Sequence, residues 1–102
     1  EPLQPAMIVS NEPGYYKTGE YGIRIENLLL VERREMPGAE REMLGFETLT
    51  FAPIDRNAIA VELLTAEEQQ WINAYHAKVI EIVGPQLEGA ALAWLKAACA
   101  PL

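Results

Sequence analysis

Hydrophobic and polar positions follow different periods in the two halves of the chain. Between Met7 and Pro53, apolar residues come in short runs separated by turn residues, which is typical of strands. From Thr65 onward, apolar residues recur at the spacing of an amphipathic helix. Strands followed by helices, without alternation between them, predict an α+β fold.

Three stretches of the first half are predicted strands. They are residues 7–10, 21–33 and 44–52. The first is followed by Asn-Glu-Pro-Gly at residues 11–14, where we expect a tight turn. Residues 33–43 carry Pro37, Gly38 and several charges, so they predict an exposed hairpin loop between the second and third strands.

Two helices are predicted in the last third of the chain. Thr65 with Glu68 three positions later has the pattern of a capping box, and Gly84-Pro85 should end the first helix. Its apolar stripe comprises Trp71, Ile72, Tyr75, Val79 and Val83. The second helix, residues 87–98, would complete an antiparallel αα-hairpin. We expect the strands, residues 1–53, and the helical extension, residues 54–102, to form one compact unit.

Composition and charge exclude several classes of partner. The chain has 8 basic and 15 acidic residues and a net charge of -7, so we expect neither nucleic acid nor a membrane surface as a partner. No apolar run reaches the length of a membrane span. The single cysteine, Cys99, cannot form an internal disulfide, and we therefore expect a reducing, cytoplasmic setting.

Candidate chemistry is concentrated in Glu12, Arg24 and Glu26. Arg24 and Glu26 share one side of a predicted strand, and Glu12 follows another strand. Buried carboxylates need a cation or a metal as a partner. Spacing alone leaves two interpretations open: an ion pair with a separate turn glutamate, or part of a metal site, for which two glutamates supply too few ligands.

The motifs around these residues resemble a known family. Residues 7–16, MIVSNEPGYY, and residues 21–27, YGIRIEN, are similar to the end of the catalytic domain of Xaa-Pro aminopeptidases, which belong to the creatinase/aminopeptidase metallopeptidases of pita-bread fold. The segments at residues 46–55, 71–76 and 93–95 resemble the C-terminal extension of the long, three-domain type. One departure is Ala6, which stands where the family usually has glycine.

The resemblance implies a site and an activity. Glu12 would bind one of two divalent metals, manganese most often and zinc or cobalt sometimes, and would also take the proton of the attacking water. Glu26 would bridge both metals, and Arg24 would orient a ligand carboxylate. The family's other three ligands, two aspartates and a histidine, lie upstream of the matched segment, so Asp55 and His76 are not expected to be ligands; we expect His76 to be a surface or helix-packing residue.

The resemblance therefore implies that the intact protein removes an N-terminal residue that precedes proline, from Xaa-Pro peptides. Because two of five ligands are present, we expect the 102-residue chain alone to be inactive and to hold no metal. We expect a homo-oligomer; Trp71 and Trp94 are candidates for its interface or, alternatively, for the core of the αα-hairpin. A non-catalytic assembly module is the alternative function.

Overall fold

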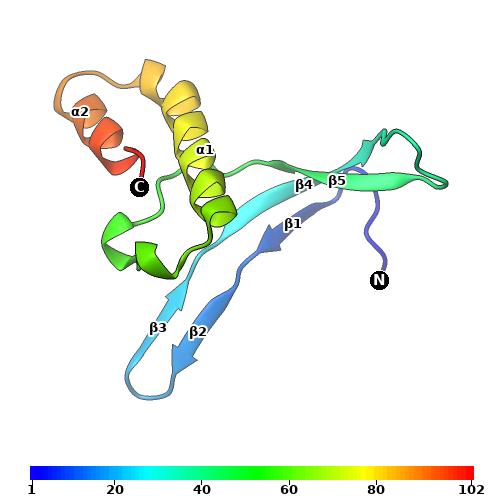
Figure 1. The fold of residues 1–102 in the computed structure, drawn as a ribbon, viewed down its shortest axis with the longest axis horizontal. Coiled ribbons are helices and arrows are strands. Elements are labelled where there is room, and N and C mark those ends of the chain that lie inside the picture. Colours follow the sequence, from blue (N-terminus) through cyan, green and yellow to red (C-terminus); the bar gives the residue numbers. More distant parts are fainter. The chain divides into compact units, whose positions relative to one another are not determined.

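The computed structural model describes residues 1–102 as two compact units, residues 1–50 and residues 51–102. Unit 1 contains five strands, β1 (Ile8–Asn11), β2 (Gly14–Lys17), β3 (Tyr21–Arg24), β4 (Asn27–Arg34) and β5 (Met43–Thr48). Unit 2 contains the helices α1 (Ala66–Val83) and α2 (Gly89–Ala98) and three short 3-10 turns. Antiparallel strands followed by two helices confirm the predicted fold class (Figure 1). The single compact unit expected from the sequence is instead divided after residue 50.

Unit 1 is built from two long antiparallel hairpins that share the strand β4. β4 pairs with β1 on one edge and with β5 on the other, which gives the order β1-β4-β5. β2 and β3 pair with each other and continue the paths of β1 and β4 (Figure 1). Val31 in the central strand β4 is 1% exposed, so it is the main buried residue of this unit.

The turn predicted at residues 11–14 is wrong. Glu12 and Pro13 form a short extended link between β1 and β2, and the chain reverses direction at residues 18–20. There the Glu20 N–H donates to the Lys17 carbonyl, and Gly19 has a φ of 75°. A left-handed glycine in a three-residue hairpin loop fits this geometry, whereas the proline and glycine of the earlier segment are accommodated at strand ends.

The β4–β5 hairpin follows the prediction in outline. Its loop lies between Arg34 and Met43, and β5 ends at Thr48 rather than at Ala52. Beyond β5, Leu49 still donates to the Leu28 carbonyl, and Leu28 N–H donates to the Thr50 hydroxyl at 2.8 Å. A side chain therefore replaces the last backbone partner of the strand pair.

Ala6 has a backbone conformation that favours glycine. Its φ is 73°, and Met7 N–H donates to the Gln4 carbonyl, so residues 4–7 form a turn with Pro5 second and a left-handed residue third. That is the pattern of a type II turn, whose third position is usually glycine. Alanine in place of the family's usual glycine at position 6 thus puts a Cβ on a residue with a left-handed backbone, which is a strained conformation for alanine.

We predict that Ala6→Gly stabilises unit 1. The substitution removes a left-handed alanine, which costs about 1–2 kcal/mol, and part of this gain is offset by the added freedom of glycine in the unfolded chain. A net gain of up to about 1 kcal/mol should appear in urea unfolding followed by far-UV circular dichroism. Ala39→Gly, at an alanine without a positive φ, is the control and should not stabilise; equal effects of both changes would contradict the strain.

In unit 2, α1 begins and ends as its sequence predicts. Thr65 Oγ1 accepts from Glu68 N–H at 3.1 Å while the Glu68 carboxylate accepts from Thr65 N–H at 3.3 Å, which completes the capping box. A 3-10 turn at Gly84–Gln86 follows the helix. Neither α1 nor α2 is long and apolar enough to cross a membrane.

The core of unit 2 differs from the predicted apolar stripe of α1 at two positions: His76 is in the core and Trp71 is not. Tyr75, Val79, Leu95 and Cys99 form the buried cluster, and His76 is fully buried on the same helix face. The tryptophans are not in this core: Trp71 is 55% exposed and Trp94 is 63% exposed. Trp71 instead stacks on the outside of Tyr75, with ring centroids 5.5 Å apart. The expectation that His76 packs on the helix holds, whereas a surface position for it is wrong.

Two adjacent residues of α1 hold the segment that enters unit 2. The Tyr75 hydroxyl accepts from Ala52 N–H at 3.2 Å and donates to the Ala52 carbonyl at 3.0 Å. His76 Nε2 accepts from Ile54 N–H at 3.0 Å. Residues 52–54 have no strand partner, so these side chains supply the hydrogen bonds that a neighbouring strand would otherwise make.

Candidate metal centre

The register of the strand pair in unit 1 places Glu12 opposite Glu26. β1 and β4 are paired down to Asn11 and Asn27, and the pairing resumes at Gly14 and Arg24 in β2 and β3. Each strand path has two residues in between, and Ile25 N–H donates to the Pro13 carbonyl at 3.2 Å within that gap. The register is therefore unbroken, and the two glutamates are cross-strand neighbours.

Two carboxylates at opposed positions repel each other unless a cation lies between or beside them. Arg24 supplies one positive charge: its Nε lies 3.1 Å from Glu26 Oε2. Both side chains of this ion pair are more than a third exposed, so the pair contributes little to stability. The ion-pair interpretation of Arg24 and Glu26 is thus correct as geometry, but it leaves the charge of Glu12 uncompensated.

A fourth side chain, Tyr16, joins this arrangement and was not singled out by the sequence. Tyr16 pairs with Gly22 across β2 and β3, on the same side of the strands as Arg24. Its ring covers both neighbouring glycines, because a Cβ on Gly14 would lie 2.6 Å from the Tyr16 hydroxyl and a Cβ on Gly22 2.8 Å from its ring. The sequence signal for this arrangement is the glycine at both positions. It indicates a place for the Tyr16 ring only when the pairing of β2 with β3 is known.

Tyr16 and the two glutamates act together on Arg24. A hydrogen bond that the Arg24 guanidinium donates to the Tyr16 hydroxyl, then the negative charge of Glu26 and more weakly that of Glu12, raises the pKa of Arg24. Arg24 is therefore a fixed positive charge held between a phenol and a carboxylate. Such a guanidinium fixes the direction in which the Glu26 carboxylate points.

The donor set fits part of a site for hard divalent cations. Glu12 and Glu26 offer carboxylate oxygens, which magnesium-like and manganese-like ions prefer. No group of three or more His, Cys, Asp or Glu side chains in the structure could hold a metal. The two glutamates are thus an incomplete ligand set.

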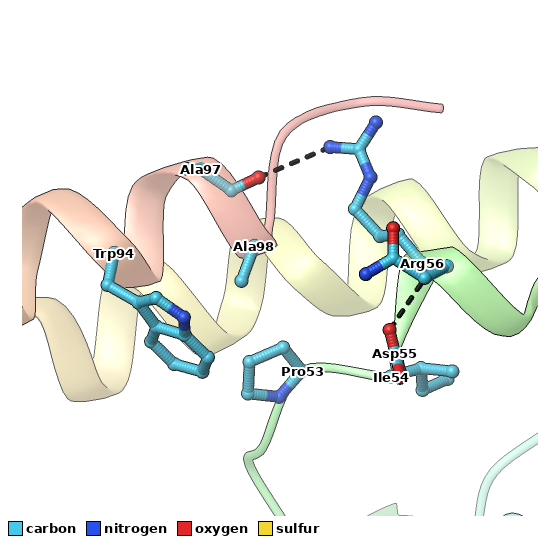
Figure 2. A pocket seen from close by; sticks show the side chains of 8 residues that line it. Pro53, Ile54, Asp55, Arg56, Trp94, Ala97 and Ala98 are labelled. Carbon is cyan, nitrogen blue, oxygen red and sulfur yellow. Dashed lines mark hydrogen bonds between the residues drawn. The ribbon is translucent and has the colours of Figure 1, made fainter.

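Asp55 and His76 belong to unit 2 and serve its own fold. Asp55 accepts from Asn57 N–H at 3.0 Å at the start of a 3-10 turn. His76 is a buried residue of α1. Unit 2 has a hollow of about 560 Å³, lined by Pro53, Asp55, Arg56 and Trp94 among others. Figure 2 shows these side chains. Arg56 in this hollow donates to the carbonyls of Ala97 and Ala100, so its charge caps the end of α2.

Comparison with protein families separates the same two parts of the chain. Residues 1–33 match the metallopeptidase family M24, and residues 42–102 match the C-terminal region of peptidase M24. The chain belongs to the M24 metallopeptidase family. The M24 match contains Glu12, Tyr16, Arg24 and Glu26, and the match to the C-terminal region contains both helices.

Individual relatives of this M24 chain carry consistent descriptions. It is 45% identical to a probable Xaa-Pro aminopeptidase P of Laccaria bicolor over 99% of its length, and 54% identical to aminopeptidase P2 of Arabidopsis thaliana over 86%. Among solved structures it resembles the X-prolyl aminopeptidase of Caenorhabditis elegans, a cytosolic enzyme with a di-nuclear active site, with a TM-score of 0.84, 36% identity and 98% coverage. The chain spans only 16%, 13% and 17% of these three proteins.

Because Glu12 lies opposite Glu26, we expect that removing the charge of Glu12 will not lower the melting temperature of the M24 chain. In a metal-free sample with chelator, Glu12→Gln removes like-charge repulsion and should leave the melting temperature unchanged or raise it. Glu20→Gln is the matched control, because Glu20 forms an exposed ion pair with Lys17 at 2.6 Å and its loss should not raise the melting temperature. Thermal unfolding followed by circular dichroism checks this; a drop of several degrees for Glu12→Gln alone would show that its carboxylate has a stabilising partner in the fold.

Proposed function

We propose that the full-length protein is a dinuclear metal aminopeptidase that removes the N-terminal residue preceding proline, and that this chain is its C-terminal part. The observation that carries the proposal is the opposed pair of Glu12 and Glu26, with Arg24 bound to Glu26. This pair lies within the residues that match the metallopeptidase family. The names of the relatives and the di-nuclear site of the nematode enzyme support the substrate class and the metal number.

Each residue of the centre has a proposed role. Glu12 and Glu26 would both hold the divalent metals, most often manganese, with Glu26 shared between the two, and Glu12 would also accept the proton of the attacking water. When bound, the metals lower the pKa of a coordinated water so that hydroxide is available near neutral pH. Arg24 holds the Glu26 carboxylate in its bridging direction, and Tyr16 holds Arg24.

Removal of either ligand in the full-length protein should remove metal and activity together. We expect Glu12→Ala and Glu26→Ala to lower kcat/KM on an alanyl-proline peptide by about 100-fold or more, with metal content falling in parallel. Arg24→Lys keeps the charge but not the fork of donors, and should cost about 10–100-fold. Metal analysis by mass spectrometry and peptide hydrolysis give both readouts. Glu20→Ala, in the hairpin turn, is the control; full metal content in both glutamate variants would remove the ligand assignment.

The 102-residue chain alone should be inactive. Two carboxylates supply too few donors for two metals, and each missing ligand removes both charge and a preorganised oxygen or nitrogen. We expect no hydrolysis of a Xaa-Pro peptide and no stoichiometric manganese after dialysis, measured on the purified chain. Turnover that survives further purification would contradict the division of the site between this chain and the rest of the protein.

We further propose that the full-length protein is a cytoplasmic homo-oligomer. The cytosolic nematode relative supports the location. The exposed indole of Trp94 beside the hollow of unit 2, and that of Trp71, support a contact surface, because exposed aromatic side chains are enriched at interfaces.

A further inference from the structure

The hydrogen bonds of His76 fix its protonation state. Nε2 accepts from Ile54 N–H at 3.0 Å, so Nε2 must carry a lone pair and the neutral ring must hold its proton on Nδ1. His76 is 0% exposed, and Nδ1 is buried without a hydrogen-bond partner.

The surroundings of His76 offer no partner for a second proton. Among charged groups, Arg56 acts on the ring and is itself positive, while the Asp55 carboxylate is turned to Asn57 N–H. The neighbouring titratable groups are Tyr75, whose ring centroid lies 5.9 Å away, and Cys99 of the adjoining core. Burial raises the pKa of the Cys99 thiol, so it stays neutral at physiological pH. An imidazolium here would face the Ile54 N–H as donor against donor.

We propose that His76 is a pH-sensitive latch: a solvent proton that binds Nε2 breaks the hydrogen bond from Ile54 N–H and releases Ile54 from α1. Ile54 is the fourth residue of unit 2, which begins at Phe51. The two hydrogen bonds between Ala52 and the Tyr75 hydroxyl do not involve His76, so they hold the other end of the segment.

The direction of the pH dependence follows from the two states of the latch. Burial, and then the charge of Arg56, lowers the pKa of His76 in the closed state, whereas the open state has the ordinary value of 6.5. The open state therefore binds more protons below pH 6.5, and opening becomes easier as the pH falls. Above pH 6.5 neither state is protonated and opening is independent of pH. Below the lowered pKa both states are protonated and the effect levels off.

Hydrogen exchange of the full-length protein between pH 5 and pH 8 tests the latch. Pro53 has no N–H, so a peptic peptide that covers residues 51–55 reports few amides and resolves Ile54. After correction for intrinsic exchange, protection of Ile54 should be constant above pH 6.5 and fall up to tenfold per pH unit below it. Constant protection of Ile54 down to pH 5 would overturn the proposal.

Two variants separate the latch from general acid loosening. His76→Gln places a non-titrating oxygen near the position of Nε2, so it should keep protection of Ile54 at pH 8 and remove the slope below pH 6.5. Tyr75→Phe should raise exchange at Ala52 equally at every pH and keep the slope at Ile54. The same slope in His76→Gln as in the unaltered protein, or no slope in Tyr75→Phe, would contradict a latch at His76.

Discussion

The opposition of Glu12 to Glu26 is the constraint on which the proposed metal centre depends. It exists because β1 and β4 stay in register with β2 and β3 across a gap of two residues on each path. A shift of one residue would turn Glu26 to the other face and pair Glu12 with Ile25 or Asn27 in its place. Like charges at opposed strand positions favour a cation beside them, and Arg24 supplies one positive charge next to Glu26.

The sequence identified the three charged residues of this centre but not how they meet. Residues 11–14 have the composition of a tight turn, and local propensity cannot distinguish a turn from two strand ends that carry proline and glycine. Register is a property of pairing between distant residues, so Tyr16 could not be linked to Arg24 before the partner of Gly22 was known. The ligand roles of Glu12 and Glu26 came from the resemblance, and the fold adds their proximity.

Unit 2 shows the same division between local and distant information. The capping box at Thr65 and the helix end at Gly84 are encoded within a few residues, and both are found where predicted. His76 is buried where it accepts from Ile54 N–H, more than 20 positions away, whereas Trp71 is exposed and stacks on Tyr75. From hydrophobicity alone, Trp71 is expected in the core and His76 outside it. The backbone N–H groups of Ala52 and Ile54 need hydrogen-bond acceptors, and Tyr75 and His76 supply them from inside the core.

Anomalous X-ray diffraction from crystals of the manganese-loaded full-length protein is the most direct test of the central claim. Two anomalous peaks should lie within about 2.5 Å of carboxylate oxygens, with Glu26 bound to both metals and Glu12 to one. Arg24 should still lie beside the carboxylates. Metal peaks elsewhere, with no metal bound to Glu12 or Glu26, would contradict the claim that the strand register brings these two glutamates together as metal ligands.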